Sequence, residues 1–213
     1  MPVIGHLNTA ARRQQGIALI TAVIMLMVIT VLALAGARIA LDTKRSTRNQ
    51  RDFEIAFQAA QAALRDAETD ISYATGKNNR TWLFQPDSST GFVAGVCGTS
   101  TDKATPYLGL CDNGDTTKNI WDIVDWTATI GPQTVEYGTF TGNNFPTGSG
   151  LTPARKPRYL IELLPDRSNG EDATVGAGQT SAFIYRVTAV GFGPNDTTRA
   201  MVQMYYRKPK ANS

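Results

Sequence analysis

The clearest pattern in the sequence is an uncharged apolar run at residues 17–37. It holds 21 residues, and only Thr21 and Thr30 in it carry polar side chains. As an α-helix the run would span about 32 Å, which matches a bilayer core of about 30 Å. The apolar core of a secretory signal peptide is shorter and is followed by a cleavage site of small residues. The run therefore predicts a transmembrane helix, and hydropathy alone leaves a plain signal anchor open.

A helical pattern with one apolar face follows directly at residues 38–75. This segment contains neither Pro nor Gly, and its apolar residues recur every three or four positions. They are Phe53, Ala56, Phe57, Ala60, Leu64, Ala67, Ile71 and Ala74. The opposite face carries Arg51, Gln58, Arg65, Glu68 and Asp70. Because Gly76 and polar residues then give a stop signal, we expect one helix over 17–75, about 88 Å long, transmembrane over 17–37 and amphipathic over 38–75.

The remaining chain, residues 76–213, has the composition of a β-rich globular domain. It holds most of the glycines and nine of the ten prolines. Alternating and β-branched runs predict strands at 119–130, 133–140, 158–164, 182–190 and 198–207. The sequence from Gly193 to Asp196 predicts the turn between the last two strands, and residues 141–152 and 165–179 are expected to be surface loops. The expected fold class is α+β, with the long helix packed on an antiparallel sheet.

The charged residues that bear on function lie on both sides of the apolar run. The net charge is +3, with Arg12 and Arg13 before the apolar run and five basic residues soon after it: Arg38, Lys44, Arg45, Arg48 and Arg51. Basic residues that flank a membrane helix indicate lipid headgroups as partners, and no direct nucleic-acid partner is predicted. Cytoplasmic flanks usually carry the excess of Lys and Arg, so charge alone does not establish the membrane orientation.

Cys97 and Cys111 are the two cysteines of the chain. An even number of cysteines in an exported domain predicts a disulfide, while two free thiols would suit a cytosolic protein. Closing a loop of about 15 residues would stabilise the fold by roughly 3 kcal/mol in the chain-entropy model. The absence of catalytic machinery also favours an exported domain, and we expect the disulfide.

Few residues in the sequence are candidates for catalysis or for metal or ligand binding. The one histidine, His6, lies in the leader described below, which removes histidine-based nucleophile triads and histidine zinc sites from the mature chain. Asp112, Asn113 and Asp115 are weak calcium candidates, because no Glu closes a twelve-residue loop, and a plain turn is the favoured interpretation. Asp122 and Asp125 lie between Trp121 and Trp126, a pattern that could line a sugar cleft, but a strand or turn with packing tryptophans is the favoured interpretation. We expect no cofactor and no enzymatic activity.

The start of the chain resembles a known export signal. The sequence from Arg12 to Gly16, followed by Ile17-Ala18-Leu19-Ile20, is similar to a type III prepilin signal. By this resemblance, residues 1–16 are a leader peptide, the cut falls between Gly16 and Ile17, and Ile17 is N-methylated. Together with residues 57–65, this segment resembles the PilX-type minor pilins of the type IV pilus assembly system. The likeness covers residues 11–75 well and 158–207 loosely.

The resemblance implies a structural subunit that helps to initiate pilus assembly, with roles in twitching and adhesion. Implied partners are other minor pilins, the major pilin, a tip adhesin, the prepilin peptidase and the inner membrane. The implied location is a single pass of the inner membrane with a periplasmic domain, and then the filament. Two alternatives remain: a K-type pseudopilin of type II secretion, usually a larger protein, and a membrane-anchored periplasmic enzyme or sugar-binding module.

Thr21 departs from the pattern of most pilins. That position is the fifth of the mature chain, where most pilins carry a Glu that is thought to pair with the N-terminal amine of a neighbouring subunit. A carboxylate in hydrocarbon is costly unless it is paired, so its replacement by Thr is a real chemical difference. By resemblance, subunits without this Glu are placed at or near the filament tip. A tip location is therefore the expectation, with simple tolerance of Thr as the alternative.

Overall fold

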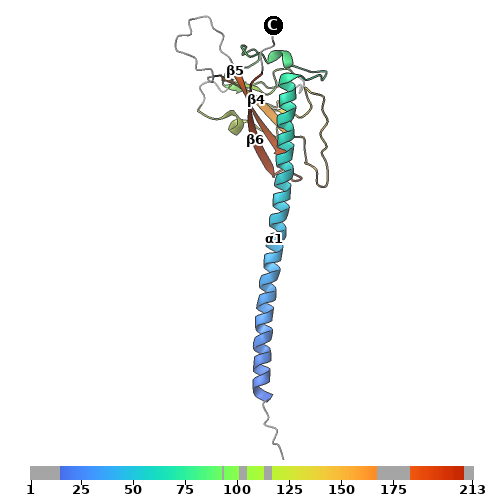
Figure 1. Ribbon diagram of the computed structural model, residues 1–213, viewed down its shortest axis with the longest axis vertical. Helices are drawn as coiled ribbons and strands as arrows, with labels where there is room; N and C mark the ends of the chain where they lie inside the picture. The colour runs from blue at the N-terminus through green and yellow to red at the C-terminus, as the bar shows by residue number, and fades with distance from the viewer. Residues whose placement is uncertain (1–14, 93, 101–104, 113–116, 167–182, 209–213) are drawn as a thin grey trace, which may run out of the picture. The chain divides into compact units, whose positions relative to one another are not determined.

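A computed structural model describes residues 15–92, 94–100, 105–112, 117–166 and 183–208 (Figure 1). Its contacts divide the chain after Arg48, and the unit from Asn49 onward holds the sheet. Each unit is described by itself. His6 and most of the expected leader lie outside the described residues, as do most of the expected loop at 165–179 and the candidate ligands Asn113 and Asp115.

The long helix α1 runs over Gln15–Ser72. It ends three residues before the expected Thr75, and Tyr73 N–H still donates to the Thr69 carbonyl at 2.9 Å. The chain turns away at Gly76, where an added Cβ would lie 2.3 Å from the Phe140 carbonyl oxygen, so only glycine fits there. Among the described residues, α1 is the helix that is long and apolar enough to cross a membrane.

Within the sheet-bearing unit, the second part of α1 buries a stripe of small side chains. Ala56, Ala60, Ala63 and Ala67 are buried, and the stripe ends on Ile71. Ala63, Ala67 and Ile71 share one hydrophobic core with the side chains that point to this face from the sheet, among them Tyr159, Ile161, Tyr185, Val187 and Ala189. The predicted amphipathic helix therefore has its apolar face on the sheet. Its short side chains allow the two backbones to approach closely.

The sheet has the strand order β1-β2-β4-β5-β6, with β3 beside β4. The strands are β1 (Val96–Cys97), β2 (Leu110–Asp112), β3 (Val135–Glu136), β4 (Arg158–Pro165), β5 (Phe183–Phe192) and β6 (Arg199–Tyr206). The long strands β4, β5 and β6 pair antiparallel over eight residues each, and β2 joins β4 in parallel. An α+β fold of the expected kind is confirmed.

The turn between β5 and β6 also agrees with the sequence. Gly193 N–H donates to the Thr198 carbonyl at 2.8 Å, and Thr198 N–H donates to the Asn195 carbonyl at 2.9 Å. These bonds close the hairpin at the Gly-Pro-Asn-Asp segment.

One strand prediction is wrong, and a second holds over two residues only. Residues 119–130 form the short helix α2 (Ile120–Ile123) and turns, and they do not form a strand. Three of their apolar side chains, Ile120, Val124 and Trp126, cover the second face of the sheet and join the buried disulfide in a second core. The run at 133–140 keeps only the two residues of β3 before Gly138 turns the chain with φ of +82°. A short 3-10 helix, η1 (Thr81–Leu83), was not expected either.

Candidate functional site

The N-terminal part of α1 is the first candidate for function, because its apolar side chains are exposed in the unit to which it belongs. Ile17 is 70% exposed, and each of the other large apolar residues as far as Leu41 is more than half exposed. A contiguous apolar surface of this size marks contact with a membrane or with protein. The segment can therefore lie in lipid or pack among similar helices.

The polar side chains of this segment are satisfied inside the helix. The Thr21 hydroxyl lies 3.1 Å from the Ile17 carbonyl oxygen and 3.0 Å from that of Ala18. Thr30 donates to the Met27 carbonyl at 2.8 Å. A hydroxyl bonded in this way offers no unpaired donor to hydrocarbon. Thr21 thus contributes neither a charge nor an unpaired donor to the helix surface.

The second candidate is a buried ionic group that joins α1 to the sheet. Arg80 and Asp70 are fully buried and form an ion pair, with Nη2 2.8 Å from Oδ2 and Nε 3.2 and 3.0 Å from the two carboxylate oxygens. The remaining guanidinium nitrogen donates to the carbonyls of Pro106 and Leu108. The Tyr159 hydroxyl donates to Asp70 at 2.8 Å, and burial raises the pKa of this phenol well above its usual value.

This arrangement corrects the sequence-based placement of Asp70. Asp70 was expected on the solvent face of the helix, but its side chain is fully buried. Asp66, one turn earlier, is buried on the same face. The sequence signal was available: two aspartates four residues apart fall between the apolar positions, and buried carboxylates require partners. The partner, Arg80, lies beyond the end of the helix and could not be deduced from spacing.

Asp66 ties a loop to the helix. It accepts hydrogen bonds from Gly138 N–H at 2.8 Å, from the Thr141 hydroxyl and from the Asn143 amide at 2.9 Å. Burial raises the pKa of Asp66, and these three bonds oppose the rise. The carboxyl therefore holds the turn at 138–143 in place.

The two cysteines lie directly opposite each other on β1 and β2 and form a disulfide between Cys97 and Cys111. Both are buried in the second core. The bond closes the segment that carries Pro106 and Leu108, the two carbonyl partners of Arg80. The disulfide and the buried ion pair therefore constrain the same loop.

The remaining chemical candidates fall into structural roles or remain predictions. Trp126 is buried and donates to the Trp121 carbonyl, and Trp121 stacks under Arg186, whose charge is paired with the buried Glu162. This is the packing that the sequence favoured. Of the calcium candidates, Asp112 lies in β2. No cluster of three His, Cys, Asp or Glu side chains that could hold a metal occurs among the described residues.

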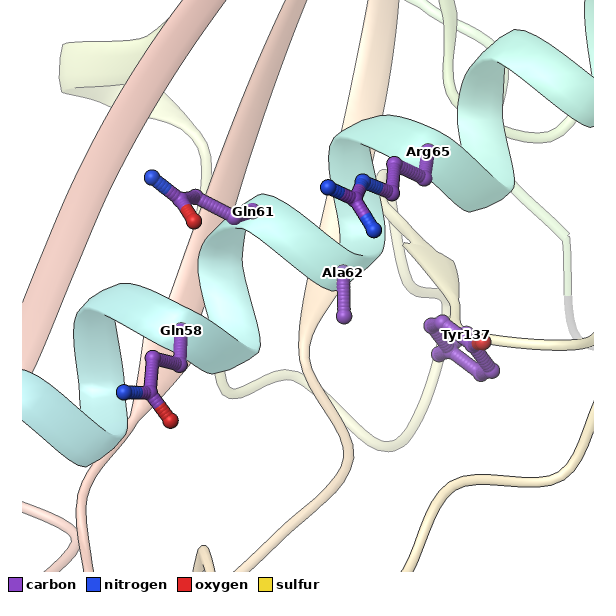
Figure 2. A pocket seen from close by; sticks show the side chains of 5 residues that line it. All are labelled: Gln58, Gln61, Ala62, Arg65 and Tyr137. Carbon is purple, nitrogen blue, oxygen red and sulfur yellow. The ribbon is translucent and has the colours of Figure 1, made fainter.

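A shallow hollow of about 250 Å³ lies on the solvent side of α1 (Figure 2). Gln58, Gln61, Ala62 and Arg65 come from the helix, and Tyr137 faces them from the segment after β3. Gln58, Gln61 and Arg65 belong to the segment at 57–65 that was singled out in the sequence. Ala59, Ala60 and Ala63 of that segment are buried, whereas Ala62 and the long polar side chains line the hollow.

Comparison with known proteins gives two matches to protein families. Residues 94–208, just over half of the chain, match the family described as Type IV pilus assembly protein PilX C-term. Residues 15–65 match the family described as PilX N-terminal. No curated protein and no solved structure shows a significant match to the chain. The two family matches therefore cover both the long helix and the sheet.

Proposed function

The chain belongs to the PilX family of type IV pilus assembly proteins, and from this premise we propose that it is a minor pilin that primes pilus assembly in a complex at the filament tip. The family comprises structural components of the pilus and not enzymes. The proposed work is accordingly the packing of helices and domains, and no reaction is assigned to any side chain.

The observation that carries the tip location is the chemistry at Thr21. A subunit in the shaft has neighbours above and below, and a carboxylate at this position can neutralise the amine of one of them. Thr21 carries no charge, and its hydroxyl lies within hydrogen-bonding distance of carbonyls of its own helix. It therefore offers a neighbouring amine no negative charge to neutralise it. Such a subunit suits a position at the end of a stack.

Processing follows the resemblance to prepilins. Residues 1–16 are the leader, the prepilin peptidase cuts between Gly16 and Ile17, and the new N-terminus at Ile17 is methylated. Residues 17–75 are then the assembly helix and residues 76–213 the periplasmic domain, with the membrane crossed at 17–37. N-terminal mass spectrometry of the native protein should find methylated Ile17. A chain that begins at Met1 in the membrane would contradict the proposal.

The proposed partners are other minor pilins, the major pilin and a tip adhesin, reached from the inner membrane. Deletion of the gene should reduce the number of surface filaments, and re-expression should restore it. Immunogold labelling of the sheared filaments should place the chain at one end. Uniform labelling along the shaft would contradict the tip location, and an unchanged filament count with lost secretion would point to a type II secretion pseudopilin.

A further inference from the structure

The hollow on α1 has a consistent chemical character. Three of its five lining residues, Gln58, Gln61 and Arg65, succeed one another along one side of the helix at spacings of three and four, so their side chains form a row. The small Ala62 between them leaves space, and the Tyr137 ring closes the opposite side (Figure 2). The surface is therefore polar along the helix and aromatic across from it.

The far wall of the hollow is held in place. Tyr137 N–H donates to the Pro157 carbonyl at 3.0 Å, and its ring packs on Phe145 with centroids 5.0 Å apart. The next residues are tied to α1 by Asp66, which accepts the Gly138 N–H. Burial and the Asp66 carboxylate raise the pKa of Tyr137, so its phenol keeps its proton at neutral pH. The hollow thus has one rigid phenol donor.

Hydrogen-bond donors in the hollow outnumber their intramolecular partners. Gln58 donates its amide to Glu54 at 3.0 Å. Within the described part of the chain, no ion pair engages Arg65 and no side-chain hydrogen bond engages Gln61, Arg65 or Tyr137. One guanidinium and one phenol therefore line the hollow, whereas the Gln61 amide points away from Tyr137 along the helix (Figure 2). A carboxylate has about four acceptor sites on two oxygens and suits such a set of donors.

We propose that this hollow binds the side chain of an Asp or Glu from a neighbouring pilus subunit, with Arg65 as the charged contact and Tyr137 as the neutral donor. The proposal rests on the proposed function, because it needs a neighbouring subunit. Charge complementarity selects the occupant: Arg65 brings a cation without a carboxylate partner in the described chain, and the size of the hollow fits one side chain rather than a helix.

The test uses the full chain in its own membrane. A photo-crosslinking phenylalanine analogue replaces Gln58, whose amide is already engaged at the edge of the hollow. Irradiation of piliated cells, followed by mass spectrometry, identifies the captured peptide. We expect a segment of another pilus subunit that contains an Asp or Glu. Adding Arg65→Glu should lower the yield on the order of tenfold, because like charges then face each other.

Charge exchange decides the outcome. Arg65→Glu combined with an Arg at the captured acidic position of the partner should restore both the cross-link and the filaments. Lys77→Glu is the matched control, since it makes the same charge change at an exposed residue outside the hollow, and it should leave the yield unchanged. Equal unfolding midpoints for Arg65→Glu and the native chain show that folding is retained.

Several results would overturn the proposal: no cross-link, capture of lipid or of a second copy of this chain, or a yield that Arg65→Glu does not change. These results differ from a failure of the proposed function. If deletion of the gene removes filaments but Arg65→Glu supports them normally, the hollow alone is wrongly assigned. If deletion leaves filaments unchanged, the proposed function itself fails.

Discussion

At the scale of single residues, Arg80 is a charged side chain that is completely buried in the sheet-bearing unit. Its guanidinium is fully buried, bonded to Asp70 and to two main-chain carbonyls, and lies 3.8 Å from the Phe140 ring centroid. Taking two charges out of water is costly, and the cost is offset only when both partners are fully hydrogen-bonded. The loss of one partner should therefore matter more than the net contribution of the pair.

Arg80→Met tests this. The substitution keeps a long side chain but leaves Asp70 buried with the Tyr159 hydroxyl as its main remaining donor. We expect the free energy of unfolding to fall by about 3–5 kcal/mol. Urea unfolding of the detergent-purified full chain, followed by tryptophan fluorescence, measures the loss. Arg155→Met, which removes a solvent-screened pair with Asp196, should cost much less. Equal losses would contradict the argument.

Asp66 gives a prediction about pH. Its pKa in the folded protein is raised, mainly by burial, so the folded state binds this proton more tightly than the unfolded state. As the pH rises from about 4 through the folded pKa, Asp66 therefore lowers the free energy of unfolding. Asp66→Asn removes this titration. The stability of the native chain minus that of the variant should fall with rising pH and then level off.

A pH series of urea unfolding curves for both proteins measures this difference. Asp196 provides the opposite control, because its bond to Arg155 lowers its pKa. Its contribution is present above the unfolded pKa and is lost in acid, so the difference between the native chain and Asp196→Asn should rise with pH. If the Asp66 difference also rose with pH, the assigned direction of its pKa would be wrong.

At the scale of elements, α1 and β5 approach each other closely at Gly191. An added Cβ on Gly191 would lie 2.0 Å from the Ala56 carbonyl oxygen and 2.4 Å from the Ala60 nitrogen. Both are main-chain atoms, which cannot move without shifting the helix. The alanine stripe and this glycine together set the distance between helix and sheet.

Gly191→Ala should therefore force the helix away from the sheet. We expect destabilisation of at least about 1–3 kcal/mol, the usual cost of overpacking a core. The thermal unfolding midpoint of the full chain measures it. Gly36→Ala is the control, because an added Cβ there meets no atom within 4 Å. A neutral result at Gly191 would mean that the helix is less closely seated than the structure indicates.

The elements also show how much of the fold could be predicted from the sequence. The helix and the strands near 158–164, 182–190 and 198–207 were predicted because each has one strong period and local turn signals. The segment 119–130 was misassigned, since its aromatic and β-branched residues cover a sheet face from a short helix and turns. The parallel pairing of β2 with β4 joins segments about 50 residues apart and has no local signal. Arg80 and the hollow depend on the same distant contacts.

At the scale of the whole molecule, the two units place their apolar residues in different environments. The unit from Asn49 onward buries them between helix and sheet and around the disulfide. The unit before it leaves them exposed along α1. Such a surface must be covered by lipid or by other helices. A protein that moves from a membrane into a filament needs a segment that is stable both in lipid and among other helices. An uncharged apolar segment meets this requirement most easily.

This argument makes Thr21 the decisive position. Thr21→Val removes a hydroxyl that is satisfied by its own helix, so the amount of chain in membranes and in sheared filaments should not change. Thr21→Glu instead adds a carboxylate to an apolar segment, at a cost of up to about 3 kcal/mol unless it is paired. In a tip subunit no neighbouring amine lies above it, so incorporation into filaments should fall. Quantitative immunoblots of both fractions measure this. If Thr21→Glu entered filaments more efficiently and labelled the shaft, a neighbouring amine would have to be within reach, and the chain would be a repeating subunit rather than a terminal one.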